Sequence, residues 1–257
     1  MTAWLLLLAA LTLWSQSVLA AVDPAQFTYR QQIGSRLSLD LPLHDETGRD
    51  TTFRQLFGVR PVILALGYFH CPNLCGVVRA DVTDAVLHSD LQSDDYTLVV
   101  LSIDTTETAE DASRAEQQDL QRAGAATLHA PWHYLTGDDA SIRQVEQDVG
   151  FNARFDAAAR QFLHPAGLVF LTPDGTISSY LLGVGYQPGD VQAGVRRAQI
   201  GAVAQAASPV LLICFHYDPH TGRYTLSILK LLELACALTV ATVGGLIALA
   251  TYRERQS

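Results

Sequence analysis

The sequence predicts an α/β domain with a mixed central sheet, because apolar runs typical of buried strands alternate with helical patterns. Three runs carry the prediction: Pro61–Leu66, Tyr96–Ile103 and Leu168–Leu171. Strands of this kind are buried on both faces of a sheet. After the third run, a Thr-Pro-Asp-Gly turn leads into residues 176–182, which indicates an antiparallel hairpin rather than another βαβ unit. This mixture of connections favours a thioredoxin-like sandwich.

The remaining elements follow from local patterns. Leucines at every second position of 37–41 predict a strand. A turn through Gly48 should lead to a returning strand at Thr51–Phe53. Helices are expected over Cys75–Leu87, Ala109–Ala123 and Ser141–Val149.

The two ends of the chain explain an unusual composition, in which 49% of the 257 residues are hydrophobic and only 17% are charged. The apolar run near the amino terminus is too short to span a bilayer and ends in small residues, which predicts a signal peptide cut near Ala20. Leu234–Tyr252 holds 19 uncharged residues, about 28 Å of helix, which predicts a membrane span. Arg253 and Arg255 favour a cytoplasmic carboxyl terminus.

These features predict a domain organisation and a location. The expected parts are a signal peptide (1–20), a thioredoxin-like domain (21–207), a juxtamembrane segment (208–229), a transmembrane helix (230–252) and a cytoplasmic tail (253–257). The main domain would then lie on the exported side of the membrane. For a bacterium, this means the periplasmic face of the inner membrane.

The net charge of −9 argues against a nucleic-acid partner, since phosphate backbones require a basic surface. The acidity is concentrated between Asp81 and Asp119, where 11 acidic residues accompany one basic residue, Arg114. This stretch is interpreted either as solvated helix faces or as a patch that steers a basic partner.

The most informative segment is Gly-Tyr-Phe-His-Cys-Pro-Asn-Leu-Cys over residues 67–75. It leaves a predicted strand and enters a predicted helix, so Cys71 and Cys75 should lie at the carboxyl edge of the sheet. The amide groups and dipole of the first helical turn stabilise thiolates there. A thiolate is both the nucleophile of disulfide exchange and a soft metal ligand. Redox and metal chemistry therefore both remain open, beside inert core cysteines or a structural disulfide.

A metal site would need a third ligand, and His164 is the best candidate. In a thioredoxin-like sheet the loop entering the strand Leu168–Leu171 faces the cysteine turn. His70 adjoins Cys71 but is expected to shape the loop, and the other histidines of the domain lie among polar or loop residues: His44, His88, His129 and His133. Two thiolates and an imidazole favour Cu(I), Cu(II) or Zn, although Zn would need a fourth ligand.

A second group of possible ligands lies before the predicted span. Cys214, His216 and His220 flank an expected hairpin turn at Asp218–Gly222. A structural or docking role is favoured over a metal site for this segment. Cys236 falls within the predicted span and is interpreted as a small apolar residue.

The motif 68–75, the strand ending Ser-Ile-Asp at 102–104, and His164 ahead of the strand at 168–171 together resemble the Sco/SenC family. The resemblance covers roughly residues 30–200. It implies a thioredoxin-fold copper chaperone that serves the binuclear copper centre of haem-copper respiratory oxidases. It further implies copper binding by Cys71, Cys75 and His164, with an oxidase copper-bearing subunit and a copper donor protein as partners.

Three positions depart from the family's pattern. Asn73 stands where the family usually has Asp, Gly76 where it has Pro, and Leu163 where an acidic residue commonly precedes the histidine. None of these changes removes a ligand, but fewer carboxylates would alter copper affinity or redox poise. Many members are also anchored at the amino end rather than the carboxyl end.

Other functions remain as alternatives. The first is a thiol-disulfide oxidoreductase that keeps a client's metal-site cysteines reduced, with Cys71 and Cys75 as its catalytic pair. A peroxidase is disfavoured because no proline-threonine-cysteine motif is evident. A non-catalytic redox sensor or scaffold is the last.

Overall fold

The computed structural model describes residues 29–70, 75–124, 131–157 and 160–205, with short pieces at 215–218, 223–226, 235–236, 239–240 and 242–244. A seven-stranded sheet in the order β2-β1-β5-β4-β3-β8-β9 forms its centre. The strands are β1 Leu43–His44, β2 Asp50–Thr51, β3 Val62–Gly67, β4 Thr97–Ser102, β5 Trp132–Gly137, β8 Gly167–Leu171 and β9 Ile177–Leu182. The helices are α2 Phe53–Leu56, α3 Cys75–Leu87, α4 Ala109–Ala123, α5 Asp139–Val149 and α6 Pro188–Gln199.

The sheet is mixed, as the sequence predicts. β3, β4 and β5 are parallel, whereas β8 pairs antiparallel with both β3 and β9. The parallel strands are joined by crossovers through α3 and α4, and β8–β9 is a hairpin. This is the thioredoxin-like arrangement that the pattern of runs indicates.

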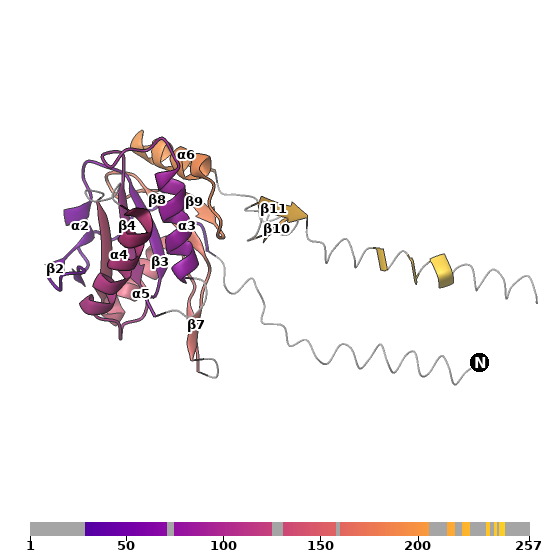
Figure 1. Cartoon of the computed structure of the whole chain (residues 1–257), viewed down its shortest axis with the longest axis horizontal. Coiled ribbons are helices and arrows are strands. Elements are labelled where there is room, and N and C mark those ends of the chain that lie inside the picture. Colours follow the sequence, from indigo (N-terminus) through magenta and orange to yellow (C-terminus); the bar gives the residue numbers. More distant parts are fainter. Residues whose placement is uncertain are drawn as a thin grey trace, which may run out of the picture.

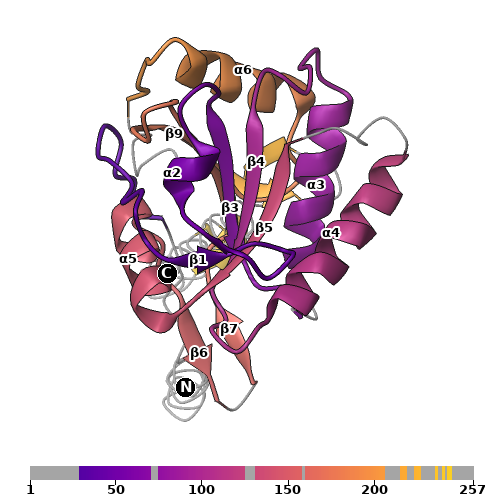
Figure 2. The ribbon, with the colours of Figure 1, turned by 90° about the vertical axis from the view of Figure 1, so that its left-hand side faces the viewer.

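Two apolar layers cover the sheet, because successive strand residues point to opposite faces. Ile63 and Ala65 of β3 pack in the layer formed with α3, α4 and α6. Leu64 and Leu66 pack in the layer formed with α2, α5 and the amino-terminal segment of the domain. Figure 2 shows α3 and α4 on one side of the strands and α5 on the other. The carboxyl ends of β3 and β4 are thereby enclosed between helices.

The predicted strand at 37–41 is wrong. In that segment Arg36 makes an isolated bridge to Thr176, and residues 39–40 form a turn. The alternating leucines reflect packing: Leu37 is buried, and Leu39 lies against the β8–β9 turn at Gly175. The strand pairing forms after this segment, where β1 and β2 pair across the turn containing Gly48. Phe53, predicted to end the returning strand, is instead the first residue of α2.

Sequence patterns also missed several elements. β5 has His133 and Thr136 among its apolar residues, and α6 contains two glycines, Gly189 and Gly194, which are poor helix formers. A second pair of strands, β6 Arg154–Asp156 and β7 Gln161–Leu163, forms an antiparallel arm. The arm projects from the body of the domain (Figure 1) and leads directly into the residue after β7, His164.

The carboxyl-terminal pieces agree with part of the prediction. β10 Phe215–Asp218 and β11 Arg223–Leu226 pair antiparallel, with Asp218 opposite Arg223, so the expected hairpin is confirmed. The described residues between 235 and 244 have helical backbone. Across the part of the chain that the structure describes, there is no helix with both the length and the apolar character needed to span a membrane. The predicted signal peptide and most of the predicted span lie outside the described residues.

Candidate functional site

The described chain leaves the carboxyl end of β3 toward the predicted cysteine turn and resumes with α3. Tyr68 is buried at the end of this strand, and the described chain continues through Phe69 and His70. Cys71 lies outside the described residues. Cys75 is the first residue of α3, and its side chain is not described. The structure therefore places the segments that flank the cysteine pair, without the positions of the two sulfurs.

His164 is held against the segment that leads into Cys71. Its ring centroid lies 5.9 Å from that of Tyr68 in an edge-on contact and 5.6 Å from that of Phe151. Phe162, two residues earlier, contacts the same tyrosine at 5.5 Å. Aromatic pairs at such separations are stabilising beyond their burial. The expectation that the loop before β8 faces the cysteine turn is thus supported by contacts between 162–164 and Tyr68.

A local hydrogen bond orients the imidazole of His164. Its Nδ1 lies 2.9 Å from the carbonyl oxygen of Pro165. Because a carbonyl can only accept, Nδ1 carries the proton of this hydrogen bond, and the neutral ring then has its lone pair on Nε2. A backbone partner of this kind is the usual means of fixing a metal-binding histidine.

An acidic side chain of α5 lies within electrostatic range of His164. Burial raises the pKa of the Glu146 carboxyl to about 7, against the opposing electrostatic effects of Arg143 and His164. Position 163, where the family resemblance leads us to expect an acidic residue, holds Leu163 at the end of β7. The carboxyl group near the histidine therefore comes from a different element.

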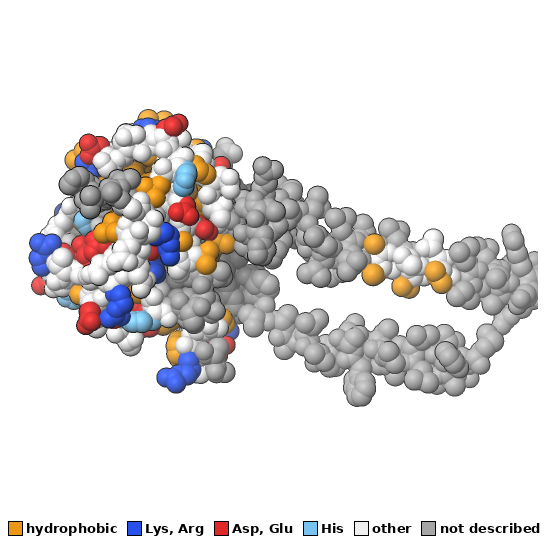
Figure 3. Space-filling model, in the orientation of Figure 1, with side chains coloured by type: hydrophobic (Ala, Val, Ile, Leu, Met, Phe, Trp, Pro, Cys, Tyr) orange, Lys and Arg blue, Asp and Glu red, His pale blue; other side chains and the backbone are white. Residues whose placement is uncertain are grey.

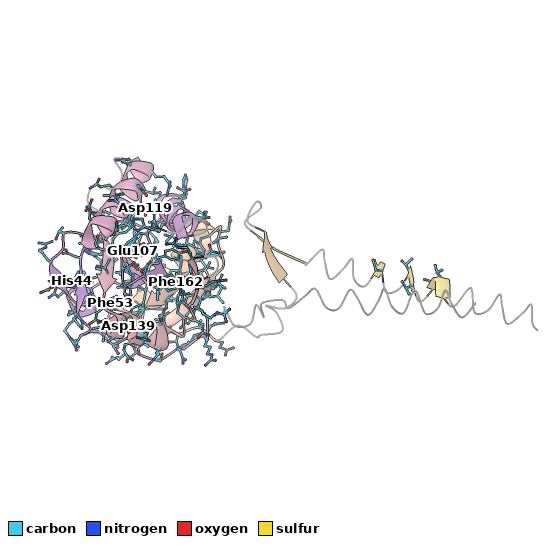
Figure 4. The ribbon with its side chains drawn as sticks, turned by 90° about the horizontal axis from the view of Figure 1, so that it is seen from below. His44, Phe53, Glu107, Asp119, Asp139 and Phe162 are labelled. Atoms are coloured by element: carbon cyan, nitrogen blue, oxygen red, sulfur yellow. The ribbon has the colours of Figure 1, made fainter. Side chains whose placement is uncertain are left out.

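Glu107 contacts the segment that enters the cysteine motif, and sequence reasoning did not single it out. It follows β4 and its side chain is 2% exposed. Its Oε2 accepts hydrogen bonds from the backbone N–H of Phe69 at 2.7 Å and from the hydroxyl of Ser102 at 2.5 Å, and its Oε1 accepts from the N–H of His70 at 2.6 Å. Figure 4 labels it near the middle of the domain in that view. A signal was available: the carboxyl ends of parallel strands meet at one edge of a sheet, so acids following β4 face the turn following β3.

His70 has a defined role in the loop, as the sequence analysis expected. Its Nδ1 lies 3.1 Å from Glu107 and its Nε2 lies 3.2 Å from Asp111 in the first turn of α4. Partial burial raises the pKa of the Asp111 carboxyl, but hydrogen bonds from Thr108 and the charges of His70 and Arg114 lower it overall. Both ring nitrogens of His70 thus face carboxylates, which favours a structural role over metal ligation.

The start of α3 is tied to α4 by a buried ion pair. Arg79 Nε lies 2.8 Å from Asp119 Oδ2, and the two side chains are 8% and 1% exposed. The hydroxyl of Tyr134 donates to the same carboxylate oxygen at 2.9 Å. Burial and the neighbouring charge of Asp119 raise the pKa of the Tyr134 hydroxyl, which keeps it a donor. This network holds the helix that begins with Cys75.

The acidic stretch from Asp81 to Asp119 is not one uniform surface. Four of its acids are exposed: Asp84, Asp90, Asp94 and Glu110. Glu107 and Asp119 are buried in the contacts given above, and Asp95 pairs with Arg196 of α6 at 2.9 Å. Figure 3 shows acidic and basic side chains interspersed over the visible face. Much of the stretch is therefore used inside the fold.

The second group of possible ligands falls mainly outside the described residues. Cys214 and His220 are not described, and only the backbone of His216, in β10, is. Within the described ranges, no three His, Cys, Asp or Glu side chains are placed to hold one metal ion. That result does not cover the set Cys71, Cys75 and His164, since two of its side chains are not described.

The fold is a mixed thioredoxin-like sheet in which His164 packs on Tyr68 at the end of β3, and the sequence continues from there into the Cys71–Cys75 motif. These features define a class of thioredoxin-like domains with a cysteine pair after β3. The comparisons narrow this class. The family profile described as SCO1/SenC matches residues 30–198, and the chain belongs to this family. No match was found among curated proteins.

Solved structures with the same fold include three Sco proteins. A SCO1/SenC family lipoprotein of Bacillus anthracis is 15% identical, with a TM-score of 0.54 over 66% of this chain and 99% of its own. Arabidopsis thaliana ScoI, with copper bound, is 15% identical, with a TM-score of 0.52 over 63% and 96%. BsSco, described as a cytochrome c oxidase assembly protein with a disulfide switch, is 14% identical, with a TM-score of 0.53 over 66% and 97%.

Proposed function

We propose that this protein is a membrane-anchored copper chaperone that assists assembly of the binuclear copper centre of a haem-copper respiratory oxidase. Copper is its cargo, taken from a copper donor protein, bound by Cys71, Cys75 and His164, and passed by ligand exchange to the oxidase's copper-bearing subunit. The observation that supports this best is the packing of His164 against Tyr68, three residues before Cys71. Membership of the SCO1/SenC family and the copper in Arabidopsis ScoI support the choice of metal.

The donor chemistry suits copper. Thiolates are soft ligands that select Cu(I), and imidazole is a good ligand of copper in either oxidation state. Cys75 opens the described part of α3, where the helix amides stabilise a thiolate. The orientation of His164 by Pro165 directs the Nε2 lone pair away from that hydrogen bond. Together these residues supply one imidazole and two thiolates.

The location is also part of the proposal. The apolar run before Ala20 is proposed as a cleaved export signal, and Leu234–Tyr252 as a carboxyl-terminal anchor in a bacterial inner membrane. The domain would then work in the periplasm.

Copper titration of the full chain tests the binding site. We expect the reduced protein to bind one copper ion, and His164→Ala to bind it markedly more weakly because one of three ligands is lost. His88→Ala is the matched control, since His88 is exposed and its ring contacts the backbone of Asp84. If His164→Ala bound copper as tightly as the parent, the proposed ligand set would be wrong.

The alternative is a thiol-disulfide oxidoreductase acting through Cys71 and Cys75. The helix start at Cys75 favours a reactive thiolate for this chemistry as well. The two functions differ in their need for His164, because exchange requires only the thiols. A His164→Ala variant that loses copper but still supports full oxidase assembly in cells would favour the oxidoreductase.

A further inference from the structure

Glu107 concentrates its contacts on the segment entering the cysteine turn. Both of its oxygens accept backbone hydrogen bonds, one from Phe69 and one from His70, at 2.7 and 2.6 Å. The hydroxyl of Ser102, at the end of β4, donates to Oε2 at 2.5 Å. A carboxylate that is 2% exposed is costly unless such donors satisfy it. This buried group therefore joins the ends of β3 and β4 through one side chain.

The positions of the two backbone donors show that Glu107 does more than stabilise the fold. Phe69 and His70 are the last two residues before Cys71, and their successive N–H groups converge on one carboxylate. Two such bonds restrict the backbone dihedral angles that set the direction of the next residue. The ring of His70 is braced in addition between Glu107 and Asp111 of α4. The chain thus enters the cysteine turn along a path determined by the loop after β4.

We propose that Glu107 is a positioning residue for the copper site, holding the backbone at Phe69 and His70 so that Cys71 is presented to the metal together with Cys75 and His164. This inference rests on the proposed function. His164 is held by ring contacts with Tyr68 and Phe151. Residues 68–70 are therefore fixed both by the aromatic contacts and by the carboxylate, and the ligand-bearing turn starts from a rigid base.

The chemistry of the carboxylate explains why a close substitute should fail. Glu107→Gln keeps the length of the side chain but replaces one accepting oxygen with an NH₂ group, which can only donate. That group would face a backbone N–H of Phe69 or His70 and could not pair with it. The protein should still fold around this site, but the entry to the cysteine turn would lose one of its two backbone anchors.

The test measures copper affinity and the spectrum of the copper-loaded full chain. Reduced parent and Glu107→Gln proteins are titrated with Cu(I) in competition with a chelator of known affinity. The thiolate-to-Cu(II) charge-transfer band is recorded for each protein in a separate sample loaded with Cu(II). We expect Glu107→Gln still to bind one copper ion, but about 10- to 100-fold more weakly, the range typical when a residue that orients a metal ligand is changed. We also expect its charge-transfer band to shift.

Glu110→Gln is the matched control, because Glu110 is 84% exposed in the same region and pairs at the surface with Arg114. It should change copper affinity less than twofold. An unchanged affinity and band in Glu107→Gln would overturn the inference while leaving the proposed function intact. Absence of copper binding by the parent would instead overturn the proposed function and the inference with it.

Ser102→Ala covers the case in which Glu107→Gln does not fold. It removes the hydroxyl's hydrogen bond to the carboxylate and the one that the hydroxyl accepts from the N–H of Asp104, and it leaves both backbone bonds to Glu107 in place. We expect a smaller loss of affinity, about 3- to 10-fold, with a band shift in the same direction. A folded Ser102→Ala protein with the parent's affinity and band would count against positioning by Glu107.

Discussion

At the scale of single residues, carboxylates near the sheet edges behave differently according to what surrounds them. Glu107 is buried but fully engaged by donors from Ser102 and the backbone. Burial dominates at Glu146, so the pKa of its carboxyl rises to about 7. At Asp174, in the β8–β9 turn, hydrogen bonds from Thr172 and Arg36 lower the pKa of the carboxyl to about 2.

Asp174 gives the fold a measurable pH dependence. The unfolded carboxyl has a pKa of about 3.9, so this group stabilises the fold above pH 4, and the contribution is lost as pH falls toward 2. Its side chain is 55% exposed, so we expect Asp174→Asn to lose only about 1 kcal/mol at pH 7, and to approach the parent's stability in acid. Urea unfolding at pH 7, 5 and 3 measures this. Asp94→Asn, in a surface pair with Arg60, is the control. If the free energy of unfolding of Asp174→Asn differed from the parent's by the same amount at all three pH values, the prediction would be contradicted.

Residue patterns predicted the position of His164 better than that of Glu107. The position of His164 beside Tyr68 could be predicted, because an apolar strand follows the histidine and the loop entering that strand faces the turn after β3 in a thioredoxin-like sheet. The position after β4 narrows the 11 acids of the stretch to a few, but it does not single out Glu107, since neither burial nor hydrogen bonding is visible in a charge pattern. Its role depends on contacts between residues 69 and 107, which are separated in sequence and brought together by β3 and β4.

At the scale of elements, the fold depends on close approach between helices and sheet. Buried strands such as β3 and β4 were predictable because each contains a continuous apolar run. Helix α6 was not predictable, because Gly189 and Gly194 weaken the helical pattern of its sequence. The helix forms there because tertiary packing overrides this low propensity. Gly194 has a packing reason: a Cβ there would lie 2.6 Å from ring atoms of Phe170 in β8.

Alanine substitutions at the two glycines of α6 should therefore have opposite effects. Gly194→Ala is expected to cost about 1–3 kcal/mol, because the added methyl group forces α6 away from Phe170. Gly189→Ala meets no atom within 4 Å and should be neutral or stabilising by up to about 1 kcal/mol. The free energy of unfolding in urea, measured for both variants, separates the two effects. Equal values would mean that α6 does not pack closely on β8.

At the scale of the whole molecule, an export signal and an anchor would confine copper exchange to one side of a membrane. We expect the full chain to sediment with membranes and to resist alkaline carbonate extraction, because Leu234–Tyr252 is long enough to span a hydrocarbon core. A chain ending at Ser227 should be released in soluble form from the periplasm.

An introduced charge supplies a sharper version of the membrane test. Val240→Arg places a guanidinium near the middle of the proposed span, where insertion costs about 2.5–3.5 kcal/mol. We expect this variant to be extracted by carbonate much more readily than the parent, while Val203→Arg, at an exposed position of the domain, should behave as the parent does. The domain should be digested by protease added to spheroplasts, which exposes only the periplasmic face. Protection of the domain would contradict the proposed topology, and full extraction of the parent would contradict the anchor.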